Sequence, residues 1–275
     1  MIDLHTIVFG KMVDSFLDIT LPCLLQDGNL PAARDLVDRY TIYASPEAKE
    51  KITSHPLYPK VSSLVKVEWE PLRKEDANSN LIAQMRRASE RKNHMLGAAP
   101  DTAIGNYSIL NMARLSTTPH VLFNGSVKIT YEGLMEIKRF LREKGSISNR
   151  ELVSISMKHI LAGAYTFRKS DPNKECWTVI RTVYSPCFIP DQRIVDFYSD
   201  NPTPASGYDH VLPYFLVQNG YPWKIVGDSD VYFIAEAEFD QEMKVGAGTW
   251  HPEMIKPSEQ FFSQFTGIWR GKEER

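Results

Sequence analysis

The chain has 275 residues, of which 43% are hydrophobic and 24% charged, and its formal net charge is −2. This composition is typical of a soluble globular protein with a substantial core, and it lacks the basic surplus of a duplex-binding protein. The N-terminus does not read as a secretion signal, and no segment has the roughly 20 apolar residues of a membrane span. The three cysteines, Cys23, Cys176 and Cys187, show no metal-binding spacing, so reduced thiols and a cytoplasmic location are expected.

Strands and helices are predicted to alternate through the first 130 residues. Compact apolar runs indicate strands, and apolar residues that recur at helical spacing indicate helices. The strands are expected over residues 6–9, 40–43, 65–69, 94–101 and 120–129, and the helices over residues 13–25, 31–38, 46–52, 80–92 and 107–115. This order predicts an α/β fold with a mostly parallel sheet flanked by helices.

The second half of the chain has a different pattern. Two helices are expected over residues 133–144 and 150–162, and Ser148 and Glu151 have the spacing of a capping box. The elements expected to follow are a strand over residues 177–180, a helix over 209–218, strands over 223–226 and 231–238, and a surface helix in the tail from Lys256. No internal repeat or clear linker divides the chain, which favours a single domain.

Asp101 is the first candidate functional residue. It is expected to follow an apolar strand and to precede a helix, so it would lie at the carboxyl end of a strand, where α/β sheets bind their ligands. A carboxylate at that place can reach a phosphate through a divalent cation. The alternative interpretation is a turn or helix-capping aspartate, because Asp is favoured at such positions.

Asp209 and the pair Asp228 and Asp230 form the second candidate region. Asp209 is expected at the start of a helix, with Pro213 in its first turn, and a carboxylate at a helix N-terminus stays ionised. Such a fixed carboxylate could accept a proton from an attacking hydroxyl. The alternatives are a capping residue for Asp209 and a solvated turn for Asp228 and Asp230.

Other catalytic signatures are absent from the sequence. There is no GxGxxG after the first strand, no phosphate-binding GxxxxGK[ST] loop and no GxSxG elbow. The histidines show no paired metal-ligand spacing.

The two acidic regions together resemble the GT-A class of nucleotide-sugar glycosyltransferases, in a bacterial and phage branch. In that class a strand ends in an Asp-x-Asp motif, and later an acidic residue opens a helix ahead of a glycine turn and a further strand with an acidic turn. The corresponding blocks are residues 98–104, 208–210 with Gly220, and 226–230. Residues 16–32 and 149–153 also resemble the bacterial and phage branch. Ala99 replaces the first acid of Asp-x-Asp, and Asn106 stands where the branch has an acid.

This resemblance implies a fold and a set of site residues. The fold would be one GT-A-like, Rossmann-type domain, with residues 1–130 as the nucleotide-sugar-binding half and 131–275 as a helical insertion and acceptor-side half. Asp101 would bind Mn²⁺ or Mg²⁺, Asp209 would be the base with His210 beside it, and Asp228, Asp230 or His251 would complete the metal coordination. The residues implied at the nucleotide are Phe9, Lys11, Tyr43, Ser45, Arg86, Arg87 and Pro100.

The expected function is transfer of a sugar from a nucleotide sugar, expected to be a UDP-sugar, to a hydroxyl acceptor. The acceptor could be a glycan, a lipid-linked sugar, a protein or a modified nucleobase; the charge neither indicates nor excludes nucleic acid. One alternative is a nucleotidyltransferase on a similar sheet, which the lack of a Gly-rich, Lys-bearing first loop disfavours. The other is a degenerate sugar-nucleotide-binding or scaffold protein, which Ala99 and Asn106 favour and the intact Asp209 block disfavours.

Overall fold

The structure is a computed structural model of the 275-residue chain. It describes residues 1–72, 77–117, 121–161, 166–170, 174–180, 183–200, 215–237 and 266–272. None of the helices within these ranges is long and apolar enough to cross a membrane.

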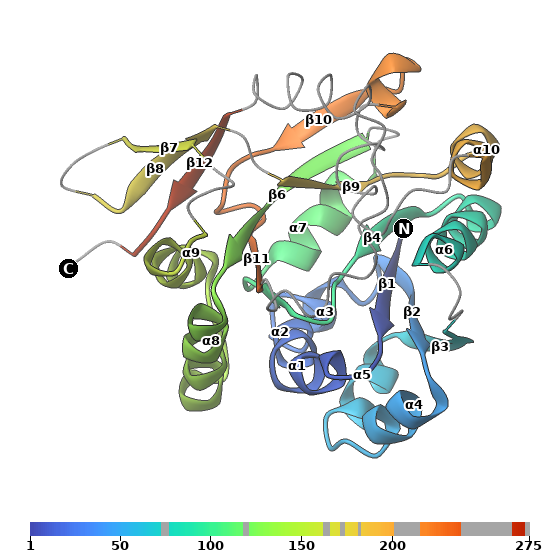
Figure 1. The fold of residues 1–275 in the computed structure, drawn as a ribbon, viewed down its shortest axis with the longest axis horizontal. Helices are drawn as coiled ribbons and strands as arrows, with labels where there is room; N and C mark the ends of the chain where they lie inside the picture. Colours follow the sequence, from blue (N-terminus) through green and yellow to red (C-terminus); the bar gives the residue numbers. More distant parts are fainter. Residues whose placement is uncertain are drawn as a thin grey trace.

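Four parallel strands form the first sheet, in the order β3-β2-β1-β4 (Figure 1). Their bounds are Ile2–Val8 for β1, Val37–Ala44 for β2, Lys66–Pro71 for β3 and His94–Gly97 for β4. Because successive side chains on a strand point to opposite faces, Leu4 and Val8 on β1 share one face with Tyr40 and Ile42 on β2. All four side chains are buried in the main apolar cluster. The predicted α/β fold with a mostly parallel sheet flanked by helices is confirmed.

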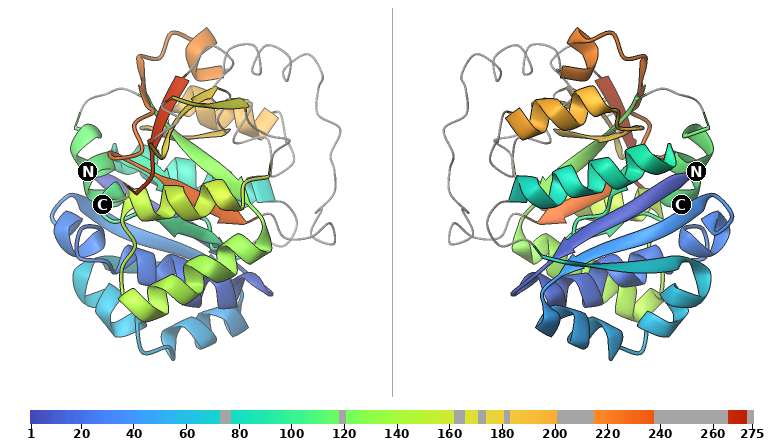
Figure 2. Two further views of the ribbon diagram at one scale, coloured as in Figure 1. Left: turned by 90° about the vertical axis from the view of Figure 1, so that its left-hand side faces the viewer. Right: turned by 90° about the vertical axis from the view of Figure 1, so that its right-hand side faces the viewer.

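Helices cover both faces of this sheet. The apolar face packs against a group of helices that follow β1 and β2, and these helices share its apolar cluster. They are α1 (Met12–Ser15), the π-helix η1 (Phe16–Thr20), α2 (Leu21–Leu24), α3 (Leu30–Ala33), α4 (Pro46–Thr53) and α5 (Tyr58–Leu64). The other face lies under α6 (Ala77–Arg91), which packs beside α10 (Gln192–Asp200) in the right-hand view of Figure 2.

A second sheet contains β10, β6, β11 and β5 in that order, and β9 also pairs with β6. Their bounds are Thr102–Ile104 for β5, Val121–Ile129 for β6, Val183–Cys187 for β9, Trp223–Val226 for β10 and Ile234–Ala237 for β11. The backbone N–H of Met95 on β4 donates to the Phe188 carbonyl just after β9, at 2.7 Å. This bridge places the second sheet directly beside the first.

The remaining elements surround the second sheet. The helices are α7 (Ser108–Leu115), α8 (Tyr131–Lys144) and α9 (Asn149–Lys158). A small antiparallel sheet, in the order β12-β8-β7, contains β7 (Thr166–Lys169), β8 (Cys176–Ile180) and β12 (Thr266–Arg270). The predicted capping box is present at the start of α9, where the Ser148 and Glu151 side chains each bond the other's backbone N–H.

Several predicted boundaries are wrong. The strand expected to reach Asp101 ends at Gly97. Pro100, which lacks a backbone N–H, then lies in a turn, and β5 pairs antiparallel with β11. The helix expected from residue 31 to 38 ends at Ala33, and the strand expected from residue 231 begins only at Ile234.

In the described part of the C-terminal tail, residues 266–272, the structure differs from the prediction of a surface helix. Within it, Thr266–Arg270 form a strand that pairs with β8. Trp269 is only 2% exposed and packs edge-on against Phe233, with 5.2 Å between ring centroids. In a strand, alternate side chains point to the same face, and this places the Trp269 indole in the core. The energy gained by burying it outweighs any preference of residues 266–270 for a helix. Of the predicted helix over residues 209–218, the described part, residues 215–218, is helical.

Buried amide side chains hold the connection between β5 and α7. Gln26 donates to the Ile104 carbonyl at 2.9 Å and accepts from the Ile147 N–H at 2.6 Å. Asn29 donates to the carbonyls of Cys23 and Gly105 and accepts from the Ile109 N–H at 3.0 Å. These bonds satisfy backbone groups that have no partner in a regular element, and they fix the end of β5 opposite to Asp101.

We expect Asn29→Ala to destabilise the protein by roughly 3 kcal/mol, because it removes three hydrogen bonds and leaves the Ile109 N–H without the acceptor it has in the native structure. In a chain of this size the melting temperature should fall by about 6–12 °C. Thermal unfolding followed by circular dichroism measures the effect. Asn219→Ala, at an exposed position, is the control and should change the melting temperature little; equal effects of both variants would contradict the role of Asn29.

Candidate active site

Asp101 lies in the turn that joins the two sheets, immediately beyond the carboxyl end of β4. The Thr6 hydroxyl donates to the Ala98 carbonyl at 2.6 Å. The Thr20 hydroxyl, at the end of η1, lies 3.1 Å from the Ala99 carbonyl oxygen and 3.0 Å from that of Thr102, and it accepts from the Thr102 N–H at 3.2 Å. Two buried threonines therefore fix the backbone that carries Asp101. The predicted location at the carboxyl edge of the parallel sheet is correct, although Asp101 belongs to a turn and not to β4.

Glu236 and Lys128 lie beside Asp101. Glu236 on β11 is in register with Thr102 on β5 and with Lys128 on β6. Thr102, the residue after Asp101, therefore forms one row across the second sheet with Glu236 and Lys128. The Lys128 ammonium and the Glu236 carboxylate form an ion pair. We call Asp101, Glu236 and Lys128 the acidic site.

The electrostatic environment makes ionisation of Asp101 unfavourable. Burial, the larger cause, and the nearby Glu236 carboxylate together raise the pKa of Asp101 to about 6, against the opposing effect of Lys128. When both carboxylates are ionised the acidic site carries two negative charges against one positive charge. A cation bound there would favour the ionised form of Asp101 by offsetting both the cost of burial and the repulsion from Glu236.

The composition of the acidic site suits a hard divalent cation. Mg²⁺ and similar ions prefer oxygen ligands and are commonly held by one or two carboxylates, with waters and substrate phosphates supplying the rest. Asp101 and Glu236 provide two such carboxylates. Among the described residues, no group of three or more His, Cys, Asp or Glu side chains could by itself hold a metal ion.

Asp228 and Asp230, the predicted additional metal ligands, are not at the acidic site. They lie in the connection between β10 and β11, four or more residues before β11, whereas Asp101 adjoins the other end of the β5–β11 ladder. Arg150 donates to both carboxylate oxygens of Asp230, at 3.1 and 3.0 Å, and Arg270 pairs with Asp228. These arginines neutralise both aspartates, so the prediction that Asp228 and Asp230 bind the metal together with Asp101 is corrected.

Asn106 also has a structural role. Its side-chain oxygen accepts from the Gly28 N–H at 2.9 Å and from the Tyr107 N–H at 3.1 Å. Tyr107 has a φ of 72°, a left-handed conformation that is uncommon for non-glycine residues. Asn106 thus supports a turn at the end of β5 remote from Asp101, and an acid is not needed there.

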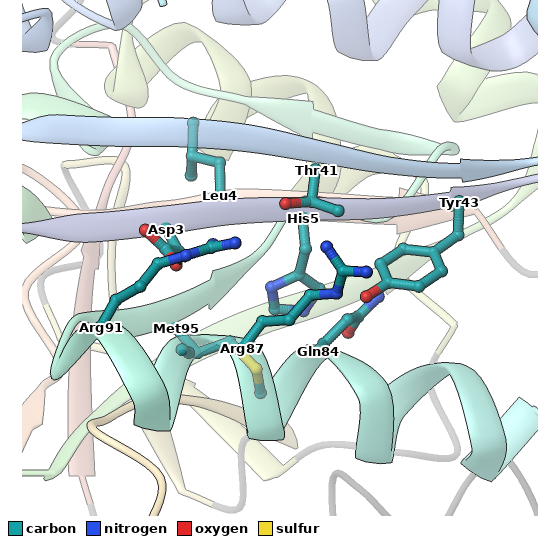
Figure 3. Close-up of a pocket in the computed structure, with 10 residues that line it drawn as sticks. Asp3, Leu4, His5, Thr41, Tyr43, Gln84, Arg87, Arg91 and Met95 are labelled. Atoms are coloured by element: carbon teal, nitrogen blue, oxygen red, sulfur yellow. Dashed lines mark hydrogen bonds and ion pairs between the residues drawn. The ribbon is translucent and has the colours of Figure 1, made fainter. Parts of the chain in front are cut away.

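Two of the residues implied at the nucleotide, Tyr43 and Arg87, come together beneath α6. They line a cavity with His5, Thr41 and Gln84 (Figure 3). The cavity volume is about 10 Å³, the space of a single water molecule, so it does not admit a nucleotide in this conformation. The Arg87 guanidinium pairs with Glu70 at 2.6 Å.

The other implied residues are dispersed. Ser45 caps α4 by accepting from the Ala48 N–H at 3.2 Å. Phe9 and the exposed Lys11 follow β1 at the carboxyl edge of the sheet, whereas Arg86 is exposed on α6. Pro100 is buried in the turn before Asp101. The predicted base Asp209, its neighbour His210 and the predicted metal ligand His251 lie outside the described residues, so their roles stay predictions.

The sequence analysis missed Glu236, Lys128 and Thr20. Two of them had a detectable signal, because Glu236 interrupts the apolar strand of Ile234, Ala235 and Ala237, and Lys128 lies between Val127 and Ile129. A charged residue inside an apolar strand needs a partner. Thr20 gave no comparable signal, since its importance depends on contacts with residues about 80 positions away.

Comparisons with known proteins give little further information. No protein-family model matches the chain, and no curated protein matches its sequence. Among solved structures, the inositol-1-phosphate CTP transferase from T. maritima is similar over 94% of this chain and 95% of its own, with 8% identity and a TM-score of 0.36. A TM-score of that size establishes neither a shared fold nor a shared function.

We expect Asp101→Asn to stabilise the protein at pH 7 when divalent cations are removed with EDTA. The folded state binds the Asp101 proton more tightly than the unfolded state, so wild-type stability falls as the pH rises from 3.8 to about 6. The ionised side chain therefore costs about 2–3 kcal/mol at pH 7, and asparagine removes that cost.

Urea unfolding at pH 4 and pH 7 measures this change, and Asp35→Asn, whose side chain is 90% exposed, is the matched control. Asp101→Asn should raise the stability at pH 7 and have little effect at pH 4. A loss of stability at pH 7 would show that Asp101 is held by favourable interactions and is not under electrostatic strain.

Proposed function

We propose that the protein is a glycosyltransferase that uses a nucleotide sugar, expected to be a UDP-sugar, and transfers the sugar to a hydroxyl acceptor. The observation that carries this proposal is the acidic site, in which Asp101, at the carboxyl edge of the parallel sheet, lies near Glu236 on the adjoining second sheet. The resemblance of the sequence to GT-A glycosyltransferases supports the same reaction. Fold-level similarity alone would not define the chemistry.

Glu236 provides the second carboxylate that the sequence lacks at Ala99. The Asp-x-Asp motif supplies two acids from one strand end, and only Asp101 remains here. Glu236 comes from β11, in the row next to Asp101, so the acid pair is assembled from two elements. Lys128 forms an ion pair with Glu236 and would add a positive charge near the position of the leaving phosphates.

The proposed reaction breaks the bond between the anomeric carbon and the nucleoside diphosphate. A divalent cation at the acidic site would supply positive charge to the departing diphosphate. Asp101 and Glu236 would hold the cation in a fixed position. Exclusion of water from the site would strengthen the attraction between the cation and the diphosphate. The acceptor hydroxyl oxygen forms the new bond to the anomeric carbon and loses its proton to Asp209, the proposed base. If the configuration is retained, Asp209 would instead orient the acceptor or stabilise the donor.

The test is an assay of nucleoside diphosphate release from a panel of nucleotide sugars with Mn²⁺. We expect one donor to be turned over, by transfer or by slow hydrolysis, and Asp101→Asn to lower the rate by roughly 100-fold, the scale of losing one preorganised electrostatic group. Asp35→Asn, which changes an exposed carboxylate, should retain the wild-type rate.

Two outcomes would contradict the proposal. Release of pyrophosphate from a nucleoside triphosphate, without turnover of any nucleotide sugar, would identify a nucleotidyltransferase. Binding of a nucleotide sugar without any turnover would favour a sugar-nucleotide-binding or scaffold protein.

A further inference from the structure

A groove lies between the helix that follows β1 and the helix that follows β6. One wall is formed by α1 and η1 and the other by the first half of α8. Its volume is about 360 Å³, within the range of small-molecule sites. The cavity beneath α6 has only about 10 Å³, so of these two spaces the groove alone has room for an organic ligand.

Apolar side chains line the groove, and some of them are exposed to solvent. Ile19 and Leu134 are buried and form its apolar base, whereas Tyr131 is 53% exposed and Met135 is 40% exposed at its rim. Both rim residues lie on α8, one turn apart. Neighbouring exposed apolar side chains in a concavity are typical of a binding surface.

The charged residues that line the groove are two lysines and two aspartates: Lys11, Lys138, Asp14 and Asp18. Lys51 pairs with Asp14 at 2.5 Å, and Asp18 is shared between Lys138 and Arg142. Lys11 lines the same groove and, among the described residues, has no ion pair or side-chain hydrogen bond. Both lining aspartates are thus engaged by other cations, and the ammonium of Lys11, which has no partner within the described residues, is available to an anion.

Both walls of the groove continue into the acidic site. Thr20, at the end of η1, bonds the backbone on either side of Asp101. Lys128 of the acidic site precedes Tyr131, at the start of α8, by three residues. Short stretches of chain therefore connect both walls of the groove to the acidic site.

We propose that this groove binds an amphipathic organic phosphate, with its phosphate at Lys11 and its apolar or aromatic body against Tyr131 and Met135. Lysine is a common point-charge partner for phosphate, and the apolar rim provides a surface for the rest of the molecule. Two sources share this chemistry: the nucleoside diphosphate of a donor and the phosphate of a lipid-linked acceptor. The inference concerns binding alone and stands whether or not sugar transfer occurs.

The test is isothermal titration with two probes, uridine 5′-diphosphate and octyl phosphate, in EDTA so that the acidic site contributes no cation. We expect at least one probe to bind, and Lys11→Ala to weaken it about tenfold, the scale of a hydrogen bond to a charged group. Lys144→Ala, an exposed lysine at the other end of α8, should bind as wild type does. The probe that binds identifies the source of the phosphate.

A second variant tests the apolar half of the proposal. Tyr131→Ala should weaken the probe that binds and leave the weak binding of inorganic phosphate unchanged. The titration contains no sugar donor and no divalent cation, so failure of the glycosyltransferase proposal remains distinguishable from failure of this one. The inference is overturned if neither probe binds, or if Lys11→Ala and Lys144→Ala bind equally well.

Discussion

The turn between β4 and β5 is the constraint on which the rest of this structure depends. It ends the parallel sheet, begins the second sheet and carries Asp101, and the hydroxyls of Thr6 and Thr20 hold it from two different elements. Thr20 lies in a π-helical segment of the helix after β1, and such segments occur frequently at functional sites. The position of Asp101 is therefore set by tertiary hydrogen bonds and not by the strand that precedes it.

Charged groups are paired differently on the face of the parallel sheet beneath α6 and at its carboxyl edge. Beneath α6 the ionic groups are tightly paired, with Arg91 bound to Asp3 and Glu68, and burial lowers the pKa of His5 to about 3, so its imidazole stays neutral. At the carboxyl edge the pairing is incomplete: Asp101 is held in a setting that opposes its ionisation, and Lys11 lacks a partner among the described residues. Incomplete pairing of this kind is typical of functional sites, although structural networks also perturb pKa values.

Features that depend on local sequence patterns could be predicted from the sequence. The βα alternation, the capping box of α9 and the location of Asp101 at the sheet edge all followed from apolar periodicity and residue type. The contacts between distant residues could not be read in this way: Glu236 reaches Asp101 through an antiparallel pairing across more than 130 residues. Asp228 and Asp230 had the residue types of metal ligands, but Arg150 and Arg270 bind them, and only the tertiary structure reveals these partners.

The central claim is that Asp101 and Glu236 together form the cation site, and electron paramagnetic resonance of Mn²⁺ tests it most directly. Titration of the protein with Mn²⁺ should reveal one site that removes the free-ion signal. The account predicts that Asp101→Asn and Glu236→Gln each abolish this site, while Asp228→Asn retains it. Unchanged Mn²⁺ binding in both acidic-site variants, or its loss only in Asp228→Asn, would contradict the account.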